Sequence, residues 1–259
     1  MNFQKKYIMS HISKGMRLDG RKIDEHRKIH IEINPIEQAE GSAKVKIGDT
    51  VVIVGVKMGV GEPFPDRLNE GVLMVNTEFS PLASPEFELG PPREKAIELA
   101  RIVDRGIRES KCIDNEKLCI TEGEKVWMVM IDVQPISHDG NLIDAAGIAA
   151  IAALMSARMP KFDGNKVVYE KTDQKLPMTH DMPVPVTCAI MEGKLLVDPD
   201  LEEEEAMEGR LTITTTADGK ICAVQKGSVG SFAMETIEEA IELSIKKGKE
   251  IRELIKKSL

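Results

Sequence analysis

The chain has 259 residues, of which 42% are hydrophobic, so it can bury a large core in one domain or in two closely packed halves. Its formal net charge of −8 argues against a protein that coats itself in nucleic acid, although a local basic patch is compatible with that charge. The aromatic content of 3% disfavours a base-stacking platform of the single-strand-binding type.

The sequence predicts a soluble protein without a membrane partner. Its longest apolar stretch, residues 145–155, is shorter than the roughly 20 residues that a membrane span needs, and an apolar signal segment is lacking at the N-terminus. We therefore expect a cytoplasmic location. The four cysteines have no CxxC or CxxH spacing, which predicts reduced thiols and no zinc or other metal site.

The first half of the chain combines strand and loop patterns with two helix patterns. Residues 1–16 are polar and unpatterned, which predicts a loose N-terminal arm or a short helix. Strand patterns follow in IHIEINPI, GSAKVKIG and TVVIVGVKMGV, with Gly48-Asp49 as the turn between the second and the third. GEPFPDRLNEG and ASPEFELGPP are predicted loops on either side of another strand, VLMVNTEFSPL. A helix is predicted from about Arg93 to Ser110, and the long strand KVWMVMIDVQPI then leads to a second helix.

The second half repeats this mixture of strands and helices. GNKVVYEKTDQKLPMTHDMPVPV is irregular, which predicts a crossover between two halves of the chain. VTCAIMEGKLLVDP predicts a hairpin that turns at Glu192-Gly193, and RLTITTTADGKICAVQKGS predicts another that turns at Asp218-Gly219. An amphipathic helix is predicted from about Met234 to Lys257. This order of elements predicts an α+β fold with mostly antiparallel sheets backed by helices.

The stretch SHDGNLIDAAGIAAIAALM places an Asp-Gly turn before the second helix. The first amides of a helix are unsatisfied donors at the positive end of its dipole, an arrangement that favours anions. The residues after the turn are Asn141, Leu142, Ile143 and Asp144, and none of them is a Lys, Arg, Ser or Thr that would complete an anion site. The structural interpretation is that Asn141 caps the helix, that Asp144 completes a box-like cap, and that residues 145–154 are buried.

Six carboxylates lie within eight residues: Asp198, Asp200, Glu202, Glu203, Glu204 and Glu205. Paired carboxylates can hold Mg²⁺ or act as general acids. A run of this kind is also typical of a solvated helix start, where negative charge suits the dipole. No His accompanies the run, so we favour the solvated helix start.

Arg101, Arg105 and Arg108 lie at i, i+4 and i+7, and hence on one face of the predicted helix. They can form intrahelical pairs, Glu98 with Arg101 and Asp104 with Arg108. They can equally form a track for phosphates, because guanidinium groups bind phosphate oxygens well. The residues alone do not decide between the two, and Arg105 is the one most available to a ligand.

The basic stretch RLDGR, residues 17–21, indicates only a turn between the arm and the first strand. We expect its side chains to be solvated.

In combination these stretches resemble the RNase PH family of phosphorolytic exoribonucleases. The matching motifs are RLDGRKIDEHRKI, EGSAKVKIGDTVVIVGVK, ELARIVDRGIRES, MIDVQPISHDGN and DLEEEEAMEGRLTI followed by ADGKICAVQ. The resemblance covers residues 15–255, and GEPFPDRLNEGVLMVNTEFSPLASPEFELGPP is most similar to the non-catalytic ring-subunit branch of the archaeal exosome. It implies an RNase PH fold of two βαβα-type halves, each like domain 2 of ribosomal protein S5. We assign residues 1–16 to the arm, 17–165 to the first half and 166–259 to the second.

The sequence departs from the active members of this family around the expected phosphate site. In active members the Asp-Gly turn is followed by Gly, by Ser or Thr, and by Arg, which bind the attacking phosphate together with the helix amides. The corresponding residues here are Asn141, Leu142 and Ile143, which implies that the phosphate site is lost. The loop that carries substrate-binding arginines in active members has Glu86 and Glu88 instead.

The catalytic Asp of active members corresponds to Arg210. A carboxyl group that protonates the leaving oxygen cannot be replaced by a guanidinium, which does not give up its proton. The alignment needs a one-residue gap at this place, so Glu208 is a conceivable substitute.

The resemblance implies a subunit without catalytic residues or a cofactor of its own. It would alternate with active RNase-PH-like subunits in a hexameric ring, three of each, and would guide single-stranded RNA, not DNA, to 3′-to-5′ phosphorolysis. Phosphate and Mg²⁺ would bind in the partner's active site, and RNA-binding cap proteins would dock on the ring. Because the arginine helix of the family faces the neighbour's active site, Arg101, Arg105 and Arg108 are assigned to RNA or to that shared site.

Two alternatives remain at this point. One is an active exoribonuclease that uses a displaced acid and a metal from the carboxylates of residues 198–205. The other is a scaffold that never touches RNA.

Overall fold

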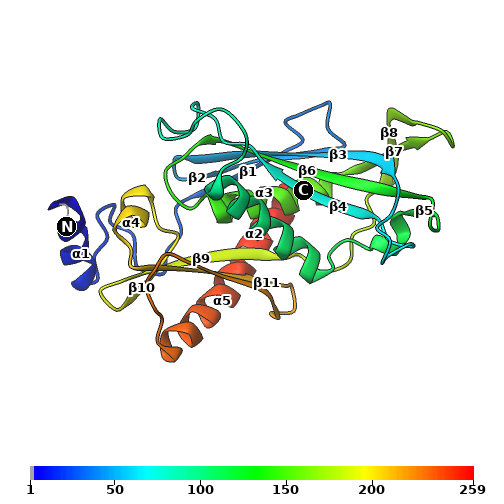
Figure 1. Ribbon diagram of the computed structural model, residues 1–259. Helices are drawn as coiled ribbons and strands as arrows, with labels where there is room; N and C mark the ends of the chain where they lie inside the picture. The colour runs from blue at the N-terminus through cyan, green and yellow to red at the C-terminus, as the bar shows by residue number, and fades with distance from the viewer. Residues whose placement is uncertain (1–2) are drawn as a thin grey trace.

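The computed structural model describes residues 3–259, and its larger sheet lies along the top of the view in Figure 1. This sheet of the described residues consists of β1 (Ile29–Ile33), β2 (Gly41–Ile47), β3 (Thr50–Gly61), β4 (Val72–Thr77), β5 (Cys119–Thr121) and β6 (Lys125–Ser137). The strand order is β1-β2-β3-β6-β4, and β5 also pairs with β6. The pairing of β4 with β6 is parallel and the other pairings are antiparallel. The hairpin between β2 and β3 turns at Gly48-Asp49, as predicted.

Two helices lie against this sheet. α2 (Glu94–Ser110) confirms the predicted helix and packs on β4, and the 3-10 helix η1 (Asn115–Leu118) connects it to β5. α3 (Leu142–Ser156) packs on β2 and β3 and also on β9 of the second sheet. Its side chains are buried from Leu142 to Leu154, which explains why its sequence has no polar face.

The second sheet and its helices complete the α+β fold that the sequence predicted. Its strands are β9 (Val184–Met191), β10 (Lys194–Val197), β11 (Gly209–Thr215) and β12 (Ile221–Gly227), all antiparallel, in the order β10-β9-β11-β12. Both hairpins turn at the predicted dipeptides, and Glu192 and Gly193 both have the positive φ of a tight hairpin turn. The helices of this half are α4 (Leu201–Ala206) and α5 (Met234–Ser258), and α5 packs on β9 and β11.

The N-terminal segment forms a helix, α1 (Phe3–Ser13), that is docked on the second sheet and is not a loose arm. Ile8 and Ile12 are buried against Met191 and Leu196. Figure 1 shows this helix at one end of the molecule, beside α4. The docking of α1 could not be predicted from the sequence, because it depends mainly on two isoleucines in an otherwise polar segment.

The segment predicted as an irregular crossover contains a strand. β7 (Arg158–Phe162) and β8 (Val167–Lys175) form a separate two-stranded antiparallel hairpin. Most of the side chains described in this hairpin are at least partly exposed. Its sequence therefore lacks the alternation of apolar and polar residues that marks a half-buried strand.

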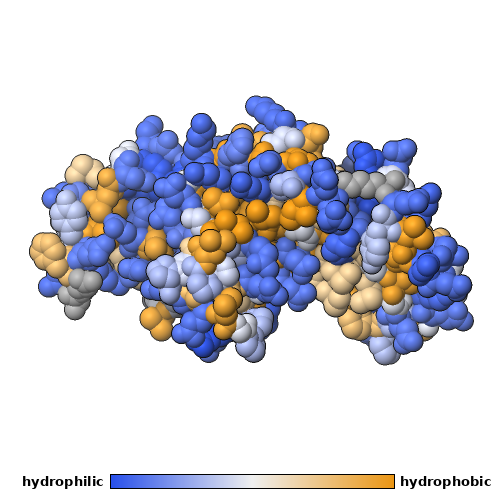
Figure 2. Space-filling view, turned by 90° about the horizontal axis from the view of Figure 1, so that it is seen from above, coloured by the Kyte–Doolittle hydropathy of each residue, from blue (hydrophilic) through white to orange (hydrophobic). Residues whose placement is uncertain are grey.

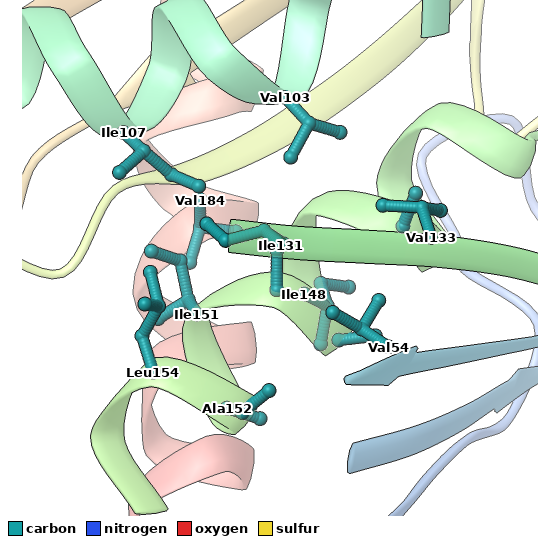
Figure 3. Packing of buried hydrophobic residues seen from close by; sticks show 14 of the residues in the cluster. Val54, Val103, Ile107, Ile131, Val133, Ile148, Ile151, Ala152, Leu154 and Val184 are labelled. Atoms are coloured by element: carbon teal, nitrogen blue, oxygen red, sulfur yellow. The ribbon is translucent and has the colours of Figure 1, made fainter. Parts of the chain in front are cut away.

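The main core lies between the two sheets, around α3. Figure 3 shows Val54 and Ile131 of the first sheet, Ile148 and Ile151 of α3, and Val184 of β9 converging there. The opposite face of the first sheet is partly exposed to solvent, since alternate residues of β3 are half-buried there. Figure 2 views the molecule from above and shows apolar residues there among hydrophilic ones.

Close packing of β2 on α3 leaves no room for a side chain at Gly41. A Cβ atom at this position would lie 2.7 Å from the Cα of Ala157 and closer still to the carbonyl oxygen of Ala153. We therefore expect Gly41→Ala to lower the free energy of unfolding by about 1–3 kcal/mol, as overpacking does. Denaturant unfolding of the purified chain measures this change.

Gly59 of β3 is the matched control for this prediction. A Cβ there would meet only the flexible end of Met130, at 3.4 Å, so Gly59→Ala should leave the unfolding free energy nearly unchanged. Equal effects of the two substitutions would contradict the packing described for β2 and α3.

Candidate functional site

The start of α3 lies at a cavity of about 340 Å³, and the residues that line it come from both parts of the chain. The lining includes Lys95, Glu98, His138, Leu142, Ile143, Glu204, Glu205 and Arg210. Burial, followed by the charge of Lys95, lowers the pKa of His138, which favours its neutral form. Acidic residues therefore outnumber basic ones around the cavity, whereas a phosphate site requires an excess of donors and positive charge.

The predicted cap by Asn141 is confirmed, but Asp144 does not close a capping box, because the amide of Asn141 donates to Glu204 instead. Asn141 adopts a left-handed conformation, and its side-chain oxygen accepts a hydrogen bond of 3.4 Å from the amide of Asp144. Its Nδ2 atom donates to Asp144, at 2.9 Å, and to Asp198, at 2.7 Å. The preceding Gly140 has φ +80°, and a Cβ there would collide with the backbone of Asp200 and Leu201. The turn is therefore fixed by contacts on both sides.

A carboxylate of the protein itself accepts from the amide at the start of α3. The N–H of Asn141 donates to Oε1 of Glu204 at 2.8 Å. Burial raises the pKa of Glu204, although this hydrogen bond and the nearby Arg210 act in the opposite direction. The anion that the helix start favours is thus supplied from α4, a contact that the sequence analysis missed.

Leu142 and Ile143 form an apolar wall of the cavity. Their side chains are buried, with 8% and 6% exposure, at the place where the family resemblance expects phosphate-binding side chains. Neither can donate a hydrogen bond to an anion.

Arg210 points its guanidinium into the same cavity. Its Nη2 atom donates to Oε1 of Glu98 at 2.6 Å, and its Nε atom is buried without a hydrogen-bond partner among the described residues. Glu208, the conceivable substitute for a catalytic Asp, does not line the cavity. Its side chain instead accepts from the amide of Glu192 in the β9–β10 turn, at 3.1 Å.

The prediction that the acidic run is a solvated helix start is only partly right. Asp200 caps α4 and forms a capping box with Glu203, as a helix start should. Asp198 and Glu203, however, are buried, with 0% and 4% exposure. Their charges are compensated by arginines, because a buried carboxylate is stable only when it is paired.

The arginines that compensate them are Arg17, in the stretch RLDGR that was expected to be solvated, and Arg27, which lies just beyond it. Arg17 is 4% exposed and binds Glu203 through two bonds, of 2.9 and 2.5 Å, and the carbonyls of Val197 and Asp198. Arg27 donates two bonds to the carboxylate of Asp198, at 2.9 and 3.0 Å. The prediction that RLDGR is solvated is thus wrong for Arg17, and also for Arg21, which donates to Asp198 at 3.0 Å. One sequence signal could have predicted these pairs: the arginines of residues 17–27 and the carboxylates of residues 198–205 are clusters of opposite charge. A chain that buries much of its surface can bring two such clusters together.

Five of the six carboxylates of the acidic run therefore accept hydrogen bonds from other groups of the protein, and Glu205 is exposed. In residues 3–259, no group of three or more His, Cys, Asp or Glu side chains is arranged as a metal site.

The three arginines of α2 differ in their surroundings. Arg108 forms the predicted pair with Asp104, at 2.6 Å, and also binds the carbonyl of Leu73, at 3.1 Å. The predicted pair of Glu98 with Arg101 is not present, because Glu98 binds Arg210. Arg101 and Arg105 are exposed, and neither forms an ion pair within the described part of the chain. These two guanidinium groups are free to bind a ligand.

The loop before α2 is acidic and exposed at its charged residues. Glu88 pairs with Arg93 at 2.5 Å, and Glu86 lies 3.8 Å from Lys95. The side chain of Phe87 is buried and stacks between Phe79 and His138, with ring centroids 4.2 and 5.4 Å away. The loop is thus anchored at the cavity while its carboxylates remain in solvent.

Fold and motifs define the class of this protein. The model of the 3′ exoribonuclease family, domain 1, matches residues 25–160, and that of domain 2 matches residues 181–247. The chain belongs to this family, the RNase PH family.

Individual members of this family are similar to the chain over nearly its whole length. The exosome complex component Rrp42 of Thermococcus onnurineus is 52% identical over 96% of this chain and 93% of the relative, and that of Methanopyrus kandleri is 48% identical over 97% and 95%. A structure described as the Archaeoglobus fulgidus exosome with RNA bound to the active site matches with a TM-score of 0.89 and 48% identity, covering 96% of both chains. An archaeal exosome core matches with a TM-score of 0.86 and 45% identity, over 98% of this chain and 96% of the other.

The Asp198–Arg27 pair predicts how stability depends on pH. Burial opposes ionisation of Asp198, but the hydrogen bonds and charge of Arg27 prevail and lower its pKa to about 2. The unfolded chain, with an Asp pKa near 4, therefore takes up the proton first as the pH falls. This stabilisation, about 2 kcal/mol, is complete above pH ~4 and is lost as the pH falls toward ~2.

This loss is measured by unfolding free energies between about pH 5 and about pH 2, the range in which an Asp carboxyl titrates. Asp198→Asn removes the titrating group, so its curve should be flatter than that of the wild type. Parallel curves for the two proteins would show that Asp198 does not carry the dependence.

The contact of Glu204 with the α3 start predicts a second set of stabilities. Glu204→Ala leaves a buried amide without its acceptor and should cost about 1–3 kcal/mol of unfolding free energy. Glu204→Gln keeps an acceptor oxygen and should cost less. Glu205→Ala, at an exposed neighbour in the same helix, is the control and should have little effect. A loss for Gln as large as that for Ala would argue against the hydrogen bond as the source.

Proposed function

We propose that this chain is a non-catalytic component of an archaeal exosome core, which shapes the active site of a catalytic RNase-PH-like partner and guides RNA to it. The support from relatives is direct: Rrp42 components at about half identity over nearly the whole chain, and exosome structures of the same fold.

The observation that carries the non-catalytic role is the state of the cavity at the α3 start. Glu204 binds the amide of Asn141, the side chains of Leu142 and Ile143 supply no donors, and Arg210 forms an ion pair with Glu98. A phosphorolytic site has to hold a phosphate and deliver a proton to the leaving oxygen. The side chains present here do neither of these.

The exposed arginines of α2 support a role in RNA binding. Arg101 and Arg105 lie one turn apart on one helix, as a track for successive phosphates requires. Arg108 contributes less, because Asp104 neutralises it. We assign Arg101 and Arg105 to RNA phosphates on the way to the partner's active site.

The wider assembly follows from the same proposal. Three copies alternate with three active subunits in a ring, RNA-binding cap proteins dock on it, and the ring degrades single-stranded RNA from its 3′ end in the cytoplasm. Phosphate and Mg²⁺ act in the partner's site. None of the helices in residues 3–259 has the length and apolarity to cross a bilayer.

The structure gives little support to an active enzyme with a displaced acid. Asp198 is bound by Arg27 and Asn141, and Glu203 is bound by Arg17. These carboxylates could bind a metal only if their arginine partners moved away.

Reconstitution tests the proposed role. The purified chain should release no nucleoside diphosphates from RNA in the presence of phosphate, whereas a mixture with the active RNase-PH-like subunit should release them. Chromatographic detection of the diphosphates measures both. Phosphorolysis by the chain alone that is abolished by Glu208→Ala or Asp200→Ala would contradict the proposal.

Charge reversal on α2 tests the RNA track. The double variant Arg101→Glu, Arg105→Glu in the assembled ring should weaken RNA binding and make it less dependent on salt, because fewer counterions are released. Anisotropy titrations at several salt concentrations measure both effects. The control is Lys249→Glu, an exposed helix residue of α5. A scaffold that never touches RNA would show identical titrations for variant and control.

A further inference from the structure

α1 carries an aromatic ledge on the side that faces solvent. Phe3 is 82% exposed and Tyr7 is 50% exposed, and His11 follows at the same spacing. Residues four apart lie on one face of a helix, about 6 Å apart along its axis. The chain has only six Phe, two Tyr and one Trp, so two exposed rings on one short helix are a concentration that overall composition conceals.

The orientation of this face is fixed by the opposite one. Ile8 and Ile12 are 1% exposed and pack on Met191 and Leu196 of the second sheet. Phe3 and Tyr7 cannot turn inward while these contacts hold. The imidazole of His11 is also held in place, because its Nδ1–H donates to the carbonyl of Tyr7 at 3.0 Å and its ring lies 4.4 Å from that of Tyr7.

The charge around the ledge is opposite to that of the whole protein. Residues 1–18 contain four of the 35 Lys and Arg, of which Arg17 is buried in its pair with Glu203, and none of the 43 Asp and Glu. Lys6 and Lys14 are exposed, and the ammonium group of Lys194 lies beside Gly15 at the C-terminal end of the helix. The carboxylate contact lies at the other end, where Gln4 donates to Glu202 at 3.0 Å. An anionic ligand is therefore attracted toward the end that holds Lys14 and Lys194.

This surface is separate from the cavity at the start of α3. α4 lies between them: Leu201, Glu204 and Glu205 line the cavity, whereas Glu202 and Ala206 of the same helix contact α1. We therefore expect that only an RNA long enough to extend past α4 reaches the ledge.

We propose that this face of α1 is a second contact site for single-stranded RNA, on which bases stack on Phe3 and Tyr7 while Lys6, Lys14 and Lys194 bind phosphates. Aromatic rings beside basic residues are how proteins bind single strands without sequence preference. The inference rests on the proposed function in one respect, that RNA reaches the assembled ring. Charge complementarity favours RNA over a protein partner, because the rings stand among Lys and Ser side chains on this face.

The test uses the full chain assembled with its active partner, without phosphate, so that RNA binds but is not degraded. A short oligonucleotide that fills only the partner's active site is compared with a long single strand. Phe3→Ala with Tyr7→Ala should weaken the long RNA about tenfold or more and leave the short one unchanged, because one stacked base contributes about a factor of ten. Lys6→Glu with Lys14→Glu should give the same selective loss and a smaller salt dependence.

Phe64→Ala with Tyr169→Ala is the matched control, because both rings are exposed but lie outside α1. It should leave both affinities unchanged. If neither α1 variant changes the affinity for long RNA, the proposal is overturned, and it is equally overturned if the variants reduce only the binding of a cap protein. A wild-type ring that fails to bind even the short oligonucleotide would instead refute the proposed function.

Discussion

The site depends most on the hydrogen bonds that one buried carboxylate, that of Asp198, accepts from its neighbours. This carboxylate accepts hydrogen bonds from Arg27, which also binds the carbonyls of Asp139 and Gly140 in the turn before α3. It accepts a further bond from Asn141, the cap residue of that helix. One charged group of the second half thus fixes the turn, the cap and the beginning of α3, and the cost of burying it is offset because every contact is to a donor.

Asp144 continues this network into the second sheet. Its carboxylate accepts bonds from the amide and the hydroxyl of Thr187 on β9, at 3.0 and 2.8 Å, and Thr187 in turn contacts Thr212 on β11. The polar network and the apolar contacts of α3 therefore hold the same two layers together. A helix start held this rigidly is suited to bind an anion, yet here the anion is Glu204 of the chain itself. The geometry of an anion-binding helix start is thus present, and its occupant is a carboxylate of the same chain.

Much of the fold could be predicted because its signals are local. The Asp-Gly and Glu-Gly turns, the start of α2 after the loop ASPEFELGPP and the apolar α3 follow from backbone conformation and burial within short segments. The missed features depend on partners that are distant in the sequence. Arg17 pairs with Glu203, 186 residues away, and Glu98 pairs with Arg210 and not with Arg101 of its own helix. Charge patterns reveal the number of ionic groups but not which pairs are brought together by folding. The strand β8 was missed because its side chains are mostly exposed. For residues 1–16 a short helix was one of the two expectations, but the docking of α1 was missed because only a few apolar residues hold it in place.

The central claim is that this chain supplies structure and RNA contacts but no chemistry. The most direct measurement uses a ring in which the catalytic Asp of the active partner has been replaced by Asn, while this chain is intact. Phosphate-dependent release of nucleoside diphosphates from a labelled RNA should then be abolished, although the ring still assembles and binds the RNA. Residual phosphorolysis that disappears on a second substitution in this chain would contradict the account.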